Sequence, residues 1–289
     1  MSIETTPRFS QALGENARFE AQAPPRRRVA PLGLVLAGLA ALTAGACGGG
    51  ASDTPAGESP APAPAAAAPA VPLGSARVAG TVSFTGEVPK LRPLVLGADP
   101  QCEAKHEGPV ANPSVQVGEG GALANVLVYV RWTQAPFAPP SEPVVVDQRG
   151  CFYAPRVVGV QTGQTVRILN SDELLHNVHA TSTANPAFNR AMPGAITQTE
   201  VVFQRPEEPF LVKCDVHPWM AAYVGVFEHP FFAVSGADGS FEISGLPAGT
   251  YELVAFHERF GTRTGSVTVE DGGSASVDFT FEATAPAGG

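Results

Sequence analysis

The chain has 289 residues, with 31 glycines, 28 prolines and a formal net charge of −9. This length leaves room for two ordinary domains after a leader is removed, and the acidic balance excludes nucleic acid as a partner. Glycine and proline are abundant, and long helical patterns of apolar residues are absent outside the N-terminal region. Turns and strands should therefore dominate, and we predict an all-β fold.

Residues 1–46 are typical of a signal peptide, which we exclude from the fold. Three arginines, at positions 26–28, precede an apolar stretch at 29–46, and Ala44-Gly45-Ala46 has the small-x-small form of a cleavage site. The rest of the chain is therefore expected outside the cytoplasm, in the periplasm or the cell envelope.

Cys47 follows this cleavage site directly and precedes a Pro/Ala-rich run. Residues 47–74 resemble the lipid-attachment cysteine and tether of a bacterial lipoprotein, although Ala44 stands where that motif usually has leucine. The lipid would hold the protein at a membrane, and the Pro/Ala run should act as a semi-extended spacer. An uncleaved single-span anchor and plain secretion are the alternatives, and both also place the remainder outside the cytoplasm.

The three remaining cysteines divide between metal chemistry and a disulfide. Cys214 lies within seven residues of an imidazole and a thioether, at His217 and Met220. An exported protein normally pairs the cysteines that it does not use chemically. We therefore predict a disulfide between Cys102 and Cys151, which would close a loop of about 50 residues and contribute about 4 kcal/mol by loop entropy.

A thiolate and two imidazoles, with a weak axial thioether, form the ligand set that favours copper in both of its oxidation states. Cys214, His217 and Met220 supply three of these groups from one loop, and His176 can supply the fourth from a separate strand end. The sequence therefore predicts one mononuclear type 1 (blue) copper site.

The same residues resemble the cupredoxins, in particular plastocyanin and amicyanin. The Cys-x2-His-x2-Met spacing and the segment His176-Asn177-Val178-His179 are closest to amicyanin, and residues 151–158 and 163–170 look like the strands that precede that family's first histidine ligand. The resemblance covers residues 136–229 and implies a Greek-key β-sandwich. The ligands that it implies are His176, Cys214, His217 and Met220, with Asn177 as the residue that steadies the thiolate loop.

The resemblance also implies a function. In cupredoxins the loop histidine reaches the surface within an apolar patch that docks a redox partner protein, so His217, Pro218 and Trp219 are expected to form the electron-transfer surface. The expected function is the transfer of single electrons between partners outside the cytoplasm. The alternatives are copper capture or delivery without redox turnover, and a glycan- or protein-binding β-sandwich module.

The sequence does not indicate an enzyme. Multicopper oxidases flank the thiolate ligand with histidines, whereas the neighbours here are Lys213 and Asp215, and six histidines are too few for an added trinuclear centre. Hydrolase, zinc-peptidase and phosphate-binding motifs are absent as well. His179 lies an odd number of positions from His176, so in a strand the two side chains face opposite ways and His179 should be a surface residue.

Residues 230–284 show alternating apolar positions broken by Asp-Gly and Pro-x-Gly turns, which are hairpin signals. This pattern resembles the latter half of the carboxypeptidase regulatory-like domain, a small transthyretin-like β-sandwich. The former half fits residues 75–135, which contain Gly80-Thr81-Val82 and an apolar strand at 125–130. We therefore expect one discontinuous sandwich with residues 136–229 inserted into it. The alternative is three consecutive pieces.

Overall fold

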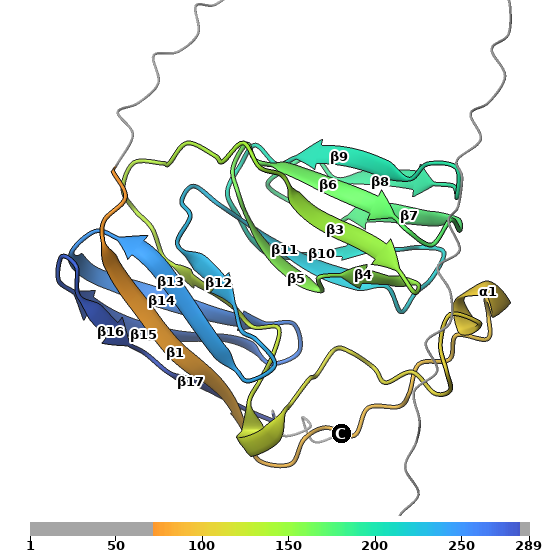
Figure 1. Cartoon of the computed structure of the whole chain (residues 1–289), viewed down its shortest axis with the longest axis horizontal. Helices are drawn as coiled ribbons and strands as arrows, with labels where there is room; N and C mark the ends of the chain where they lie inside the picture. Colours follow the sequence, from red (N-terminus) through yellow and green to blue (C-terminus); the bar gives the residue numbers. More distant parts are fainter. Residues whose placement is uncertain (1–71, 284–289) are drawn as a thin grey trace, which may run out of the picture. The chain divides into compact units, whose positions relative to one another are not determined.

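The computed structural model describes residues 72–283, and within that range its regular secondary structure is strand apart from two short helical turns (Figure 1). The predicted all-β class is confirmed. The predicted signal peptide, Cys47 and all but the last three residues of the predicted linker lie outside the described residues. None of the helices in residues 72–283 has the length and apolar character needed to cross a membrane.

One β-sandwich combines strands from both ends of the described chain. Its first sheet contains β1, β13, β16 and β17, and its second sheet has the order β12-β2-β14-β15. The strands of the first sheet are β1 (Ala76–Thr85), β13 (Ser240–Leu246), β16 (Ser274–Ser276) and β17 (Phe279–Glu282). Those of the second are β2 (Leu127–Val130), β12 (Phe232–Val234), β14 (Gly249–His257) and β15 (Gly261–Val269).

The N-terminal strands are integral to this sandwich. β1 pairs antiparallel with β13 and parallel with both β16 and β17, while β2 lies between β12 and β14. Gly80 in β1 is required by close packing, because a Cβ built there would lie 1.8 Å from the carbonyl oxygen of Val277. We call this unit the split sandwich, since residues 131–231 leave it after β2 and return to it at β12.

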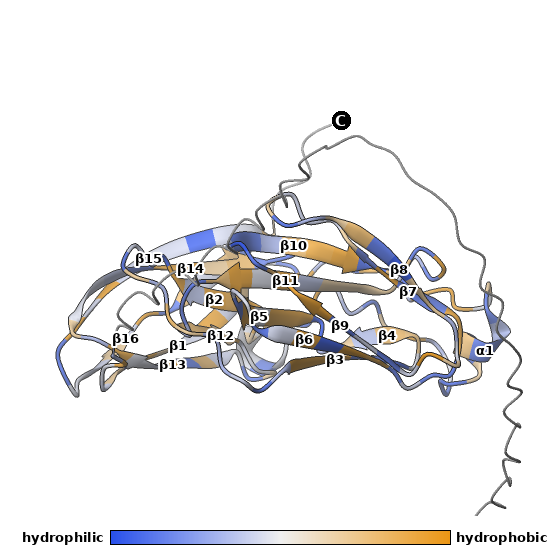
Figure 2. Cartoon of the chain, turned by 90° about the horizontal axis from the view of Figure 1, so that it is seen from above, coloured by the Kyte–Doolittle hydropathy of each residue, from blue (hydrophilic) through white to orange (hydrophobic). Residues whose placement is uncertain are grey.

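The inserted sandwich is built from β3 to β11. One sheet has the order β5-β11-β10-β7-β8 and the other β4-β3-β6-β9. The bounds are β3 (Val144–Arg149), β4 (Phe152–Ala154), β5 (Val157–Gln161), β6 (Thr165–Asn170), β7 (His176–Ala180), β8 (Phe188–Met192), β9 (Gln198–Val202), β10 (Glu207–Lys213) and β11 (Ala221–Phe227). Buried apolar side chains from both sheets form its core, and Figure 2 shows hydrophobic residues along strands such as β3 and β5.

The connection from β1 to β2 carries α1 (Pro100–Glu103) and the one-turn η1 (Glu119–Gly121). Part of this connection leaves the split sandwich and lies against the inserted one. The disulfide Cys102–Cys151 ties it there, and His106 Nε2 lies 2.8 Å from the carbonyl oxygen of Gly150. The sequence assigns residues 75–135 to the split sandwich, but the residues near α1 contact the inserted sandwich.

The two sandwiches share a small apolar cluster that includes Tyr129 and Phe227, and beside it lies a bidentate ion pair between Arg156 and Glu258. The side chains of the pair are 11% and 8% exposed. Removing one partner of such a pair leaves the other charge buried without compensation.

We expect Glu258→Gln to lower the free energy of unfolding by about 3 to 5 kcal/mol, because the Arg156 guanidinium would lose its counter-charge. The matched control is Glu252→Gln, which removes the exposed ion pair with Arg131 and should cost about 0 to 1 kcal/mol. Urea unfolding followed by circular dichroism measures both values. An equal loss of unfolding free energy in the two variants would mean that the buried ion pair stabilises the fold no more than the exposed one.

Candidate metal centre

Four of the predicted site residues meet at one end of the inserted sandwich because of strand pairing. His176 is the first residue of β7, and Cys214 follows the last residue of β10. These two strands are antiparallel neighbours, with Lys213 opposite His179. The turn from β10 to β11 then contains His217 and Met220, and it is closed by two backbone hydrogen bonds, from Met220 N to His217 O (2.9 Å) and from Cys214 N to Met220 O (3.2 Å).

The donor atoms of three of these residues converge. His176 Nδ1 lies 2.9 Å from His217 Nδ1, and Cys214 Sγ lies 3.8 Å from the same atom. All three side chains are buried, with at most 1% of their surface exposed, and their ligating atoms lie within 4.8 Å of one another. Met220 is also fully buried in the same core.

Each imidazole turns its other nitrogen to a carboxylate. His176 Nε2 lies 3.1 Å from Asp172 Oδ2, and His217 Nε2 lies 3.0 Å from Asp99 Oδ2. A carboxylate at Nε2 holds the proton there and leaves the Nδ1 lone pair free, which is the usual arrangement around a metal-bound histidine. Sequence reasoning missed both carboxylates. Asp172 lies only four positions before His176, but Asp99 is 118 positions from His217, and no local signal connects them.

Burial and hydrogen bonding shift the pKa values of two of the predicted ligands. Burial by itself raises the pKa of the Cys214 thiol, but hydrogen bonds from His176 and from nearby backbone N–H groups outweigh this effect and lower it to about 7. Burial likewise lowers the pKa of His176, whereas the hydrogen bond to Asp172 and the sulfur of Cys214 raise it to about 9. Without metal, the centre therefore favours a thiolate beside an imidazolium.

The donor set fits a single soft-to-borderline metal ion. Nitrogen donors about 2.0 Å and sulfur donors about 2.3 Å from one ion are themselves about 3 to 4 Å apart, as the His176, His217 and Cys214 atoms are here. One thiolate, two imidazoles and a buried thioether are the combination that selects copper among the common metals. His176, Cys214 and His217 could thus hold copper, with Met220 as the fourth side chain available.

Asn177 connects β7 to the cysteine loop, as the cupredoxin resemblance implies for this position. Its Oδ1 accepts a hydrogen bond from the backbone N–H of Asp215 (2.6 Å), directly after Cys214. The Asp215 carboxylate in turn contacts Lys213, His179 and Asn189. His179 therefore belongs to a half-exposed network beside the centre, and it is not part of the cluster of donor atoms.

Cys102 and Cys151 form the predicted disulfide, 5.6 Å apart at Cα. Of the cysteines in residues 72–283, Cys214 is the one that stays free. Because Cys102 precedes β2 and Cys151 lies in the turn between β3 and β4, the bridge fixes the β1–β2 connection to the metal-binding end of the inserted sandwich.

The expected electron-transfer surface needs correction at His217. Its side chain is 1% exposed, because Asp99 and Cys102 cover the edge of the imidazole that should have reached solvent. Pro218 is exposed, as expected. Trp219 is half-buried and donates a hydrogen bond from Nε1 to the carbonyl oxygen of Cys151 (3.0 Å).

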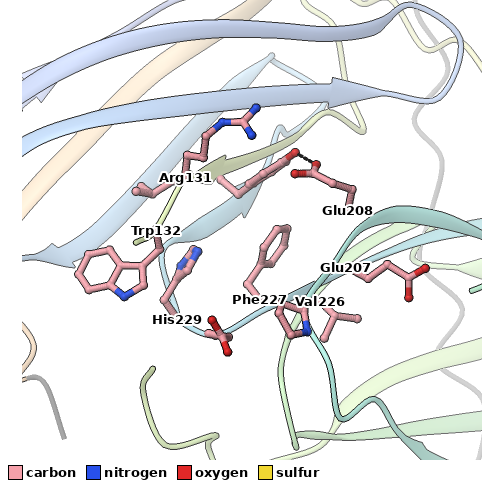
Figure 3. Close-up of a pocket in the computed structure, with 11 residues that line it drawn as sticks. Arg131, Trp132, Glu207, Glu208, Val226, Phe227 and His229 are labelled. Atoms are coloured by element: carbon pink, nitrogen blue, oxygen red, sulfur yellow. Dashed lines mark hydrogen bonds between the residues drawn. The ribbon is translucent and has the colours of Figure 1, made fainter. Parts of the chain in front are cut away.

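A pocket of about 230 Å³ lies apart from the metal centre and is lined by residues such as Trp132, Phe227 and His229 (Figure 3). Two of its polar side chains pair with protein atoms. The Tyr129 hydroxyl donates to the Glu208 carboxylate, and the Nδ1 atom of His229 accepts from the backbone of Phe231. Burial lowers the pKa of His229 to about 4, so this imidazole is neutral and structural.

Comparison with known proteins supports the family resemblance of the C-terminal segment. Residues 219–282 match the family model of the carboxypeptidase regulatory-like domain, which confirms the resemblance predicted for the C-terminal segment. The match begins at Trp219, inside the loop of the metal centre, and so overlaps the end of the inserted sandwich. No curated protein matches the chain.

Solved structures similar to this chain include copper proteins. A copper-containing nitrite reductase from Thermus scotoductus SA-01 is 20% identical over 33% of this chain and 25% of its own, with a TM-score of 0.28. A mutant of amicyanin in its Cu(I) state is 23% identical over 34% of this chain and 97% of its own (TM-score 0.27). A purple cupredoxin from Nitrosopumilus maritimus is 22% identical over 29% and 98% (TM-score 0.25). The chain thus spans a quarter of the reductase's length.

Proposed function

We propose that this protein is an exported type 1 copper protein that transfers single electrons and is not an enzyme. The observation that carries the proposal is the buried cluster in which the Cys214 sulfur and the Nδ1 atoms of His176 and His217 converge, while each Nε2 contacts a carboxylate. Copper bound there would supply a one-electron couple between its two oxidation states.

The role of the protein in this function is to keep the ligands in place. The backbone bonds of the loop hold Cys214 and Met220, and the carboxylates of Asp172 and Asp99 hold the two imidazoles. Ligands fixed in this way change little in position when the charge at the site changes, and little reorganisation is what rapid electron transfer requires. The buried apolar shell around the loop would also tune the reduction potential.

One feature of the structure and one of the sequence support a location outside the cytoplasm. The Cys102–Cys151 disulfide is typical of an oxidising compartment, and the acidic chain carries a leader-like N-terminus. We propose that the protein is held in the periplasm or cell envelope, with Cys47 as its lipid-attachment site and the Pro/Ala-rich run as its spacer.

The redox partner would dock beside the cysteine loop. Because His217 is covered, the apolar groups that face solvent near the centre are Val216 (44% exposed), Leu175 (52% exposed) and Pro218. Transient electron-transfer contacts need only a small interface. We therefore propose that the partner protein contacts these residues, and that the electron crosses the short loop instead of an exposed imidazole.

Visible and electron paramagnetic resonance spectra of the purified chain with added Cu(II) test the function. We expect one equivalent of copper to give an intense blue or green thiolate band, and we expect reduction to bleach it reversibly. Retention of the copper on dilution distinguishes a carrier from a protein that delivers copper. A colourless, folded protein would contradict the proposal.

Met220→Leu is expected to keep the copper and the visible band but to raise the reduction potential. The exchange preserves buried volume at a fully buried position, while it removes a weak donor that stabilises the oxidised state more than the reduced one. Protein-film voltammetry measures the shift. Met192→Leu, at a second buried methionine in the same core, is the matched control and should change the potential less.

A further inference from the structure

The segment of residues 99–106, which we call the covering segment, comes from the β1–β2 connection of the split sandwich. It contacts one histidine of the candidate centre directly and the other through an intervening carboxylate. It reaches His217 directly through Asp99 and Cys102. It reaches His176 through Lys105 and the carboxylate of Asp172. Figure 1 shows α1, the middle of this segment, beside the inserted sandwich.

Asp99 uses its two carboxylate oxygens for different purposes. Oδ1 accepts hydrogen bonds from the backbone N–H groups of Gln101 (2.9 Å) and Cys102 (3.3 Å), which caps the short helix and fixes the carboxylate. Oδ2 is thereby left to face His217 Nε2 at 3.0 Å. The carboxylate is thus oriented before any metal binds.

The disulfide places this carboxylate and completes the cover. Cys102 Sγ lies 3.4 Å from His217 Nε2, and its bond to Cys151 anchors the segment beside the imidazole. The result is that His217 is 1% exposed although it lies in a loop, whereas the side chain of Asp99, which covers it, is 31% exposed.

The second contact acts on the opposite ligand. Lys105 Nζ lies 3.2 Å from Asp172 Oδ1, and the backbone N–H groups of Gly150 and Cys151 donate to the same carboxylate, each at 2.7 Å. Asp172 Oδ2 also contacts His176 Nε2. The covering segment therefore supports the hydrogen-bond partners of both imidazoles.

We propose that the covering segment completes the metal centre, with Asp99 as a positioning residue that orients His217 and closes it off from solvent. This inference rests on the proposed copper function. The split sandwich then contributes to the metal site, because Asp99, which holds His217, lies in the connection between β1 and β2 of the split sandwich. Metal retention then depends on residues outside the inserted sandwich.

The first test compares Asp99→Ala with wild type in the full chain. A hydrogen-bond partner of a metal ligand typically contributes about 10- to 100-fold in metal affinity, so Cu(I) should transfer to an excess of bicinchoninate about 10- to 100-fold faster from the variant. Glu103→Ala, in the same helix at an exposed position, should release at the wild-type rate. Equal rates for wild type and Asp99→Ala would overturn the proposal.

A spectroscopic readout separates positioning from general stability. Long-range 1H–15N correlation spectra of the Cu(I) protein should show His217 protonated at Nε2 with a strongly hydrogen-bonded shift in wild type. The shift should be lost in Asp99→Ala and partly kept in Asp99→Asn, whose amide oxygen can still accept the bond. A His217 signal unchanged by Asp99→Ala would overturn the positioning role.

A third measurement needs no metal. In the metal-free wild type, diethyl pyrocarbonate should modify the 31%-exposed His179 much faster than the covered His217, and Asp99→Ala should raise the rate at His217. If His217 in the wild type were modified as fast as His179, the proposal that the covering segment shields His217 from solvent would be wrong. If no form of the protein gives a thiolate-copper band while His217 remains protected, the copper function fails and the covering role stands.

Discussion

Replacing Cys214 by serine is expected to abolish the intense visible band altogether and to weaken copper binding by more than the 10- to 100-fold typical of losing an outer-shell partner. The band requires a thiolate bound to copper, and the Cys214 thiol ionises readily because its pKa is lowered to about 7. A serine hydroxyl does not ionise in this range, and its harder oxygen suits copper poorly. Absorption spectra and copper titrations of the variant measure both effects.

Val216→Ala is the matched control for Cys214→Ser, because it alters an exposed side chain in the same loop and should keep the band. The far-ultraviolet circular dichroism of both variants should equal that of wild type, since serine is close in size to cysteine. A Cys214→Ser protein that kept the intense band would eliminate the thiolate site.

The parts of the fold that were predictable from sequence depend on local patterns. Alternating apolar residues and turn signals identified β13 and β14, and the Gly80-x-Val82 pattern identified β1. Pairing between β1 and β13 is not a local property, and it was inferred from the resemblance of the two segments to halves of one domain. The disulfide was predictable because the other cysteines had separate roles.

The environment of the site was less predictable than its donor atoms. The Cys-x2-His-x2-Met spacing places three side chains in one loop, and strand pairing brings His176 to the same end. Nothing near His217 in the sequence indicates Asp99, because a tertiary contact over 118 positions leaves no periodic signal.

The exposure of His217 was predicted wrongly for a related physical reason. A resemblance over residues 136–229 carries information about that segment only, and the exposure of a loop residue depends on every segment packed against it. Here the cover comes from residues 99–106, which lie in the connection between β1 and β2 and outside the resembling region. Insertion of one domain into another thus changed the surroundings of a side chain whose own loop pattern is unaltered.

Copper affinity is expected to rise steeply with pH, because metal must displace the protons that the free centre holds. The pKa of His176 is raised to about 9, so below pH 9 the imidazole carries a proton that copper has to remove. Cys214, with a pKa of about 7, adds a second proton below pH 7. Ligands bind metal only in their deprotonated forms.

The number of protons released sets the sign and slope of the pH dependence of copper affinity. Between about pH 7 and 9 one proton is released per copper bound, so the apparent affinity should rise about tenfold per pH unit; below pH 7 two protons are released and the dependence should approach about 100-fold per unit. Competition titrations against a chelator at pH 6, 7, 8 and 9 measure the slope, and a pH indicator in weakly buffered solution counts the protons released.

Asp172→Asn removes the carboxylate that raises the pKa of His176, so this variant should flatten the rise in copper affinity between pH 7 and 9. A copper affinity that does not change between pH 6 and 8 would mean that the copper does not bind at His176 and Cys214.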